Sequence, residues 1–319
     1  MINKIKRLFE FNVKPRLSKI HGMEMHDEDF DISSSDITFY YADFRKCILN
    51  KPNKIDDNGV FYLTYLDSDK IEYNICAVAE FAIVEFEEYL RTKNEDNKAA
   101  FENQIKWLVE NAVIKDNKLY WYYLYDDPHH KAPWGSGISQ GIGISALVRG
   151  AALFKDSHLI ELAELAANSM IATIDEGGYR YNKGSYQFWI EESGTNSHIL
   201  NGHIYSLLGF YDLYRATGKE VYNDFFKEGL GSIKKNIVDF DMKYFSTYDG
   251  VSGTPANNSY NYIHCVLFEV LYRITGDKFF LGYSRKWSEI YASTYLQVRL
   301  TVDIAGGILR SKMKNRNDE

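Results

Sequence analysis

A chain of 319 residues, of which 45% are apolar and 25% charged, has the composition of a globular protein and is long enough for one large domain or two smaller ones. Its net charge of −7 argues against a general nucleic-acid or polyanion binder, because such a protein needs a broad basic surface. The three cysteines are widely spaced without a CxxC pair, which favours reduced thiols in the cytoplasm over a disulfide framework or a zinc site; they are Cys47, Cys76 and Cys265.

The first 70 residues are mixed in character and poorly periodic. Residues 1–10 are basic and apolar but lack the long apolar core of a signal peptide, so we expect a short N-terminal helix packed on the domain. The turn residues 56–59 precede residues 60–66, whose composition predicts a β-strand. No stretch approaches the roughly 20 uninterrupted apolar residues of a membrane span, so no transmembrane segment is expected.

From residue 71 onward, apolar residues recur at three- and four-residue steps, which place one apolar face along a helix. This periodicity predicts four helix pairs: 75–82 with 101–112, 144–151 with 159–166, 204–211 with 226–237, and 263–274 with 280–290. The turns at 214–219 and 272–277 repeat each other, each with a glycine suited to closing a helix, and 153–156 is a looser copy. Stacked hairpins at this spacing indicate a solenoid or a toroid, and the divergence of the copies favours the toroid.

Aromatic, strand-like stretches precede the expected inner helices at residues 118–125, 178–190 and 244–248. In a toroid this position is the rim of the central cleft, where long loops usually build the site. The 25 Tyr, 19 Phe and 5 Trp residues suit a carbohydrate cleft, although many of them will fill core and surface.

The sequence therefore predicts an all-α protein, an α/α-hairpin toroid (incomplete or complete) with short β-hairpins at the cleft rim. We expect a mixed N-terminal segment over residues 1–70, the toroid over 71–300 and a C-terminal tail over 301–319.

Three motifs carry a resemblance to the D-glucuronyl C5-epimerase family. Residues 132–141 contain Pro-Trp, Ser-Gly and Gln-Gly pairs that resemble the opening of the conserved part of its C-terminal domain. Residues 189–192 and 197–209 are similar to the most recognisable stretch of the family. Residues 260–287 follow its pattern of a tyrosine, a histidine four residues later and a late tryptophan. The resemblance covers roughly residues 118–296.

The resemblance implies inversion of C5 of a D-glucuronyl residue in a polysaccharide, which converts it to L-iduronyl. No nicotinamide or metal takes part in the proton transfer, so no cofactor is expected. Such a reaction needs two acid/base groups on opposite faces of the ring, and hydrogen-bond donors or cations beside the substrate carboxylate. Carried over to this sequence, the catalytic positions are Glu192, Tyr248 and Tyr260. The expected partner is a uronate-containing polysaccharide or oligosaccharide, and a homodimer is left open.

The candidate substrate-binding residues are Trp134, Gln140, Arg180, His198, Asn201 and His264. Most have a structural alternative. Trp134 and Gln140 lie in a glycine-rich junction that either binds sugar or only packs. His198 and Asn201 precede an inner helix and either cap it or bind hydroxyl groups, and His264 is a core histidine or a ligand.

The chain departs from the family pattern at three positions, where Ser193, Val251 and Asn261 replace a tyrosine, an arginine and a histidine. One base and one carboxylate-binding cation are thus missing from their usual places. Arg180, Lys183 and His264 are the candidates to compensate for this loss.

Other functions stay open at this point. They are a polysaccharide lyase, a glycoside hydrolase that pairs Glu191 and Glu192 with Asp249, and a glycan-binding module without catalysis. A metal site at His129 and His130 is not expected, because adjacent side chains on a strand or turn point in different directions. The glycines at 141 and 143 are no dinucleotide-binding fingerprint, since the third glycine and the βαβ context are absent.

Overall fold

The computed structural model describes residues 23–300 and 302, apart from residues 27, 29, 49–53, 65–69, 128 and 193–195. The chain divides into two compact units, Met23–Ile237 and a second formed by Met1–Gly22 with Val238–Glu319. The expected helix at residues 1–10 and almost all of the expected tail at 301–319 lie outside the described residues, and the boundary expected at residue 70 stays a prediction.

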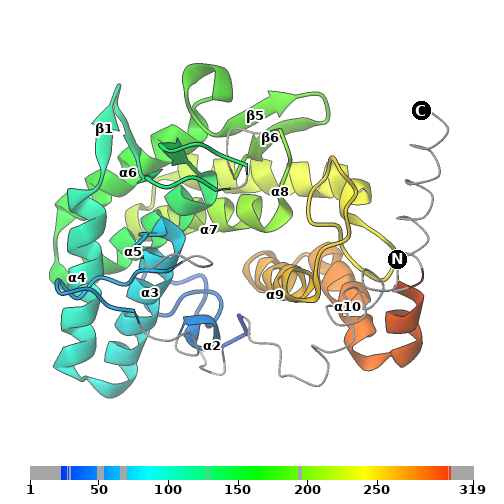
Figure 1. The fold of residues 1–319 in the computed structure, drawn as a ribbon, viewed down its shortest axis with the longest axis horizontal. Helices are drawn as coiled ribbons and strands as arrows, with labels where there is room; N and C mark the ends of the chain where they lie inside the picture. Colours follow the sequence, from blue (N-terminus) through cyan, green and yellow to red (C-terminus); the bar gives the residue numbers. More distant parts are fainter. Residues whose placement is uncertain are drawn as a thin grey trace. The chain divides into compact units, whose positions relative to one another are not determined.

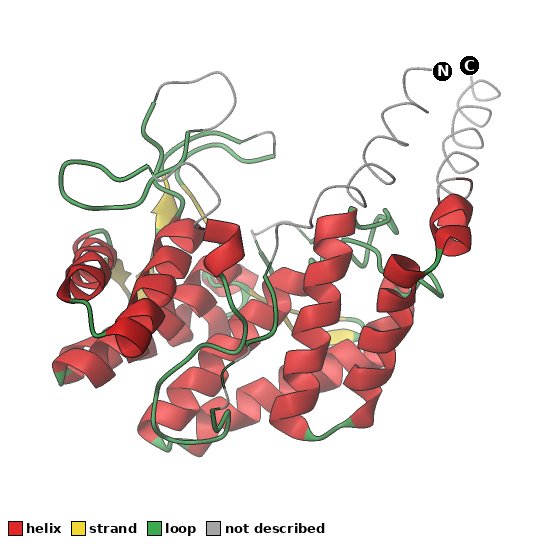
Figure 2. Ribbon diagram, turned by 90° about the horizontal axis from the view of Figure 1, so that it is seen from below, coloured by secondary structure: helices red, strands yellow, loops and turns green. Residues whose placement is uncertain are grey.

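The described chain is mainly helical, and Figure 2 shows only a few short strands between the helices. All four predicted helix pairs are present (Figure 1). They are α3 (Ile75–Thr92) with α4 (Glu95–Glu110), α5 (Gly137–Phe154) with α6 (Ser157–Ile171), α7 (Leu200–Thr217) with α8 (Glu220–Phe240), and α9 (Asn258–Thr275) with α10 (Lys278–Ala292). Short helices occur at α2 (Arg45–Ile48) and η2 (Ile174–Glu176).

Each hairpin turns through one residue in the left-handed region, and these residues are Lys93, Lys155, Gly218 and Gly276, with φ of 58°, 58°, 68° and 70°. In three of the turns the next residue caps the following helix with its side chain, as Asp277 does by accepting a hydrogen bond from the amide of Phe279 at 2.9 Å. The looser copy predicted at 153–156 is therefore a true copy of the turn, with lysine in place of glycine.

Helix α5 is the core helix of the first unit and contacts α3, α6 and α7. A Cβ atom on Gly141 would lie 2.5 Å from Cα of Ser206, and one on Gly209 would lie 2.7 Å from the carbonyl oxygen of Gly141. The backbones of α5 and α7 therefore approach at a distance that only glycine permits. Helix α5 is also long and apolar enough to cross a membrane, but 72% of it is buried in the protein, as in the core helix of a soluble protein.

Short antiparallel hairpins precede two inner helices, as predicted. Strands β1 (Val113–Lys115) with β2 (Lys118–Tyr120) and β3 (Tyr122–Tyr123) with β4 (Trp134–Gly135) precede α5, and β5 (Arg180–Lys183) with β6 (Tyr186–Ile190) precedes α7.

Two other strand predictions are wrong. In the stretches 60–64 and 244–248 the structure has isolated bridges at Phe61, Leu63, Ser246 and Thr247 in place of continuous strands; residues 65 and 66 lie outside the described part. The reason is the same in both places. The amide of Phe61 donates to the side chain of Gln104 at 2.9 Å, and the amide of Ser246 donates to the side chain of Asn261 at 2.8 Å. A helix side chain thus takes the hydrogen bond that a strand partner would have taken.

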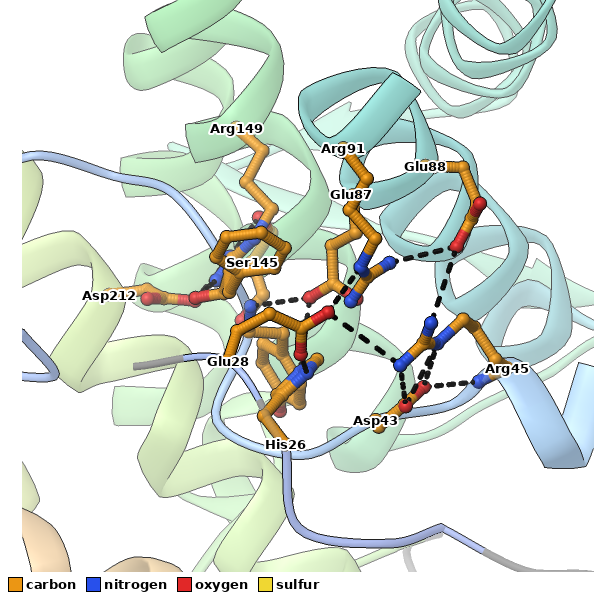
Figure 3. A network of polar contacts seen from close by, with 12 residues as sticks. His26, Glu28, Asp43, Arg45, Glu87, Glu88, Arg91, Ser145, Arg149 and Asp212 are labelled. Carbon is orange, nitrogen blue, oxygen red and sulfur yellow. Dashed lines mark hydrogen bonds and ion pairs between the residues drawn. The ribbon is translucent and has the colours of Figure 1, made fainter. Parts of the chain in front are cut away.

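A buried polar network attaches the N-terminal segment to α3, α5 and α7 (Figure 3). Arg149 and Asp212 are fully buried and form an ion pair of 2.8 Å, and the hydroxyl of Tyr41 donates to Asp212 at 2.6 Å. On α3, Glu87 accepts a hydrogen bond of 2.6 Å from the amide of Tyr40. No local sequence pattern predicts this network, because its partners lie far apart in the chain. Residues 23–48 are therefore an integral part of the first unit.

The second unit is built on α9 and α10, followed by helical residues 294–300. One hydrophobic cluster of this unit consists of Phe245, Ala256, Ile290 and Leu300, against which Tyr248 and Tyr260 pack.

Candidate active site

Two adjacent glutamates, Glu191 and Glu192, directly follow strand β6. The carbonyl oxygens of both accept the amide of Gly137, at 3.2 and 3.0 Å, at the start of α5. A Cβ atom on Gly137 would lie 2.4 Å from the carbonyl oxygen of Glu191, so the close approach requires glycine. The predicted motif at 132–141 therefore has a clear structural task, which is to hold the end of β6 against the beginning of α5.

Glu192 carries a partly buried carboxyl whose pKa lies near neutrality. Its side chain is half-buried, and its Oε2 atom is buried without a hydrogen-bond partner among the described residues. Burial, reinforced by the negative charges of Glu191 and Asp127, raises the pKa of Glu192 to about 7. A carboxyl with this pKa can both hold and release a proton near neutral pH, which suits general acid/base catalysis.

Glu191 is engaged in internal hydrogen bonds. It is fully buried, and its carboxylate accepts the backbone amide of His198 at 3.0 Å and Nδ1–H of the same residue at 2.5 Å. The ring of His198 stacks on Tyr186 at 3.9 Å. His198 has a φ of 54°, which is uncommon for a residue other than glycine, so these contacts hold a strained turn. Glu191 and His198 thus fix the two sides of the segment that carries Glu192.

His203 was not singled out from the sequence, although it supports the same strand. Its Nδ1 accepts the amide of Ile190 at 2.9 Å, its Nε2 donates to the carbonyl of Gly229 at 3.3 Å, and its ring stacks on Trp189 at 4.0 Å. Burial lowers the pKa of His203 to about 3, so the ring is neutral. The one sequence feature that could have pointed to His203 was its position on the expected inner helix, within the motif at residues 197–209.

Asn201 is the predicted substrate-binding residue whose surroundings most resemble those of Glu192. It is 5% exposed, and its Oδ1 atom is buried without a hydrogen-bond partner in the described part of the chain. The next residue, Gly202, contacts Glu192, since a Cβ atom there would lie 3.1 Å from Oε2. The structure therefore brings Asn201 and Glu192 into one neighbourhood, with two buried oxygens that no described protein group satisfies.

Trp134 and Gln140 make internal contacts. The indole of Trp134 donates to the carbonyl of Tyr125 at 2.9 Å and stacks on Tyr123 at 4.0 Å. The fully buried amide of Gln140 bridges the carbonyl of Leu119 and the amide of Trp121, both at 3.2 Å. These contacts favour the structural alternative, and the sugar-binding role of both residues stays a prediction.

Arg180 lies on β5. Its Nε donates to the carbonyl of Ile171 at 2.6 Å, and its guanidinium lies 5.7 Å from the ring centre of Phe188. The guanidinium thus packs within the hairpin and beside α6. Its role as a compensating cation for a substrate carboxylate stays a prediction.

In the second unit, Tyr248 and Tyr260 come together, with ring centres 4.7 Å apart in an edge-to-face arrangement. Both rings are half-buried. The amide of Tyr260 is held by the side chain of Asn257, which caps α9. Two tyrosines that the resemblance assigned to catalysis are therefore neighbours in space.

Asn261 and His264 lie in the core of this unit. Asn261 replaces the histidine of the family, and its amide joins Ser246 (2.8 Å) to the hydroxyl of Tyr291 (2.9 Å). Nδ1 of His264 lies 2.8 Å from Oγ of Ser246, and its Nε2 is buried without a partner among the described residues. Burial lowers the pKa of His264 to about 3. A neutral ring supplies no positive charge, so this histidine is a poor replacement for the missing arginine.

No group of three or more His, Cys, Asp or Glu side chains that could hold a metal ion occurs in the part of the chain that the structure describes. His130 is paired with Asp127 at 2.9 Å instead.

Helical hairpins with short β-hairpins before the inner helices define an α/α toroid, and solved structures share this fold. A D-mannose isomerase superposes with a TM-score of 0.54 at 12% identity, over 77% of this chain and 66% of its own. An α-mannanase of Bacteroides thetaiotaomicron, a family 76 glycoside hydrolase, superposes with a TM-score of 0.54 at 13% identity, over 89% and 72%. The predicted fold class is confirmed.

The sequence comparison then identifies the family. The chain belongs to the D-glucuronyl C5-epimerase C-terminal family, whose profile matches residues 110–289, more than half of the chain. The D-glucuronyl C5-epimerase of Caenorhabditis elegans is 26% identical over 225 residues, which are 61% of this chain and 35% of that enzyme. An uncharacterized protein of Methanocaldococcus jannaschii is 26% identical over 226 residues, which are 64% and 73% of the two chains. The chain thus spans about a third of the curated epimerase.

The predicted resemblance is confirmed by these matches. Membership of this family makes the chain a carbohydrate-modifying protein of the epimerase kind.

Proposed function

We propose that the protein is a uronosyl C5-epimerase that interconverts D-glucuronyl and L-iduronyl residues within a glycan. The observation that carries the proposal is Glu192, a carboxyl with a buried, unpartnered oxygen and a pKa raised to about 7 by burial and by neighbouring charges. Such a group costs stability and is found where acid/base chemistry needs it. The family match supports a uronosyl residue of a glycan as the substrate.

In the proposed reaction the C5–H bond breaks as its proton passes to a base on one face of the sugar. The electron pair is delocalised into the substrate carboxylate, and a proton returns to C5 from the opposite face. Glu192 acts on one face, and a second acid/base group is required for the other; Tyr248 and Tyr260 are the residues that the resemblance assigns to catalysis. Hydrogen-bond donors beside the substrate carboxylate lower the barrier, because charge builds up there.

The test is incorporation of deuterium at C5, measured by mass spectrometry on glucuronate- and iduronate-containing oligosaccharides in D₂O. Wild type should exchange C5–H and interconvert the epimers. Glu192→Gln and Tyr260→Phe should each lose net epimerisation, by about a hundredfold to ten-thousandfold, as is usual for a general acid/base group. The matched control is Glu102→Gln, which removes an exposed carboxylate on α4.

The outcomes separate the competing functions. One of the two variants is expected to keep exchange from a single face, starting from only one epimer. Wild type without exchange on any uronate tested would refute the proposal in favour of a glycan-binding module. An unsaturated product that absorbs in the ultraviolet would identify a lyase. Near-normal turnover in both variants would refute the assigned residues.

A hydrolase receives less support from the carboxylates that it would need. Glu191 is bound to His198, and Asp249 accepts hydrogen bonds from the amides of Val251 and Ser252 at 3.0 and 2.5 Å. Neither is available to pair with Glu192 across a scissile bond without breaking these contacts. A cytoplasmic location and the identity of the glycan stay predictions.

A further inference from the structure

Residues 23–48 of the first unit form a strap that contacts the inner helices α3, α5 and α7 (Figure 3). On α7, the hydroxyl of Tyr205 donates a hydrogen bond to Sδ of Met23 at 3.1 Å. On α3, one of the contacts of the strap is made by His26, a histidine that is only 6% exposed. A buried histidine between two parts of a fold can make their attachment depend on pH.

Both ring nitrogens of His26 face carboxylates (Figure 3). Nδ1 lies 3.0 Å from Oε2 of Glu28, and Nε2 lies 3.4 Å from Oε1 of the fully buried Glu87. Nε2 makes no hydrogen bond in the described part of the chain, so its contact with Glu87 is that of an ion pair. A neutral imidazole has a proton on one nitrogen only, and its other nitrogen would turn a lone pair toward a carboxylate. The geometry therefore suits the charged ring.

The charged groups around His26 come from the strap and from α3. They comprise four carboxylates and two guanidinium groups, which are Glu28, Asp43, Glu87, Glu88, Arg45 and Arg91. At the exposed border of the cluster, Glu24 and Lys46 pair with each other. The carboxylates outnumber the guanidinium groups, so protonation of His26 brings the cluster nearer to neutrality.

The pKa of His26 gives the direction in which this contact responds to pH. Burial opposes the charge of the ring, but the carboxylates of Glu87, Glu28 and Asp43 raise the pKa of His26 above its usual value of 6.5. The folded chain therefore keeps a proton that the unfolded chain releases near pH 6.5. The stabilising contribution of the imidazolium is complete below about pH 6.5 and is lost as the pH rises through the folded pKa.

The carboxylate of Glu28 stays ionised over this range. Burial raises its pKa, but Arg91 and His26 outweigh burial and lower the pKa of Glu28 to about 2. Arg91 also pairs with Glu87 at 3.6 Å, and this pair does not depend on His26. Loss of the proton from His26 therefore weakens the contact between strap and α3 without abolishing it.

We propose that protonated His26 clamps the strap to α3, and that the strap loosens as the pH rises and His26 loses its proton. The strap also contacts α7, on which Gly202 lies beside Glu192 and Tyr205 follows one turn later. The clamp is thus a pH-sensitive element that holds a segment against the helix bordering the candidate site.

Hydrogen–deuterium exchange of the full chain, measured by mass spectrometry from about pH 6 to about pH 9 without substrate, tests the clamp. After correction for the intrinsic pH dependence of exchange, the protection of peptides within the strap should fall several-fold in wild type. His26→Gln has no titrating ring, so its strap should be poorly protected at every pH. The matched control is His158→Gln, which replaces an exposed histidine on α6 and should behave as wild type does.

Two further variants keep the test independent of the folding of His26→Gln. Glu28→Gln retains an acceptor for Nδ1–H but removes a negative charge, so the fall in protection should move to lower pH. Glu192→Gln should keep the wild-type fall, because Glu192 is not part of this cluster.

Three results would overturn the proposal. They are constant protection of the wild-type strap across the range, an unchanged midpoint in Glu28→Gln, and disappearance of the fall in Glu192→Gln, which would place the titrating group at the candidate site. The exchange measurement requires no turnover, so failure of the proposed epimerase function would leave the clamp standing.

Discussion

Replacing Glu192 by glutamine should change how stability depends on pH, in addition to its effect on catalysis. In the folded protein the pKa of Glu192 is raised from 4.5 to about 7 by burial and by the charges of Glu191 and Asp127. Between these two values the folded chain keeps a proton that the unfolded chain releases. The stabilising contribution of the protonated carboxyl is therefore complete below about pH 4.5 and is lost as the pH rises through about 7.

The size of the effect follows from the shift. At about 1.4 kcal/mol per pKa unit, a rise from 4.5 to about 7 corresponds to about 3 kcal/mol of unfolding free energy. Glutamine has no proton to release, so Glu192→Gln removes this dependence. As the pH rises from about 4.5 to 8, the unfolding free energy of the variant should therefore increase by about 3 kcal/mol relative to that of wild type.

The assay is urea unfolding of both proteins, followed by circular dichroism across this pH range. The quantity of interest is the difference between variant and wild type as a function of pH, because the titration of groups that do not interact with Glu192 cancels in it. Glu102→Gln removes an exposed carboxylate of the same unit and controls for the change in net charge.

A difference that stays flat within about 0.5 kcal/mol across the range would refute the reasoning, because Glu192 would then titrate alike in both states. A difference that falls with pH would mean that a positive charge near Glu192 outweighs its burial. Either result would also remove the main support for its acid/base role.

Three further predictions follow from the packing. His198→Ala should lower kcat by about tenfold or more, as measured by steady-state kinetics. His198→Asn should recover part of this loss, because asparagine tolerates the left-handed backbone and can still donate a hydrogen bond to Glu191. Gly141→Ala should cost about 1–3 kcal/mol in thermal unfolding, because its Cβ atom would lie 2.5 Å from Cα of Ser206. Asp212→Ala should cost about 3–5 kcal/mol in urea unfolding, since it leaves the fully buried Arg149 without its partner, and a loss below about 1 kcal/mol would contradict this.

The helices could be predicted because the residues that define them are close together in the sequence. The three- and four-residue periodicity placed all four hairpins, and the repeated glycines at 218 and 276 located the turns. The strand predictions failed where a distant side chain intervened. Gln104 is 43 residues from Phe61, and no local pattern reveals that it takes the backbone hydrogen bond. The Arg149–Asp212 pair, 63 residues apart, was hidden for the same reason.

The position of the candidate site could be predicted from the sequence, but the separate roles of Glu191 and Glu192 could not. The strand-to-helix motif pointed to adjacent glutamates, and the resemblance selected Glu192. Nothing in the sequence showed that His198 would return to bind Glu191, because that contact depends on a left-handed turn at His198 itself. His203 was missed because its role, accepting the last amide of β6, exists only once the strand lies against α7.

Glu191 and Glu192 have the same side chain but different surroundings, and the surroundings give them different roles. Glu191 accepts both donors of His198, and these bonds hold its side chain in place. After burial, the charge of Glu191 is one of the two that raise the pKa of Glu192. The bound carboxylate therefore positions the segment and adds to the effect of burial on the pKa of Glu192, whose own Oε2 has no hydrogen-bond partner in the described structure. A glutamine at position 191 could keep part of the positioning, but it would lose the charge. The presence of a second glutamate beside Glu192 thus has an electrostatic reason in addition to its role in folding.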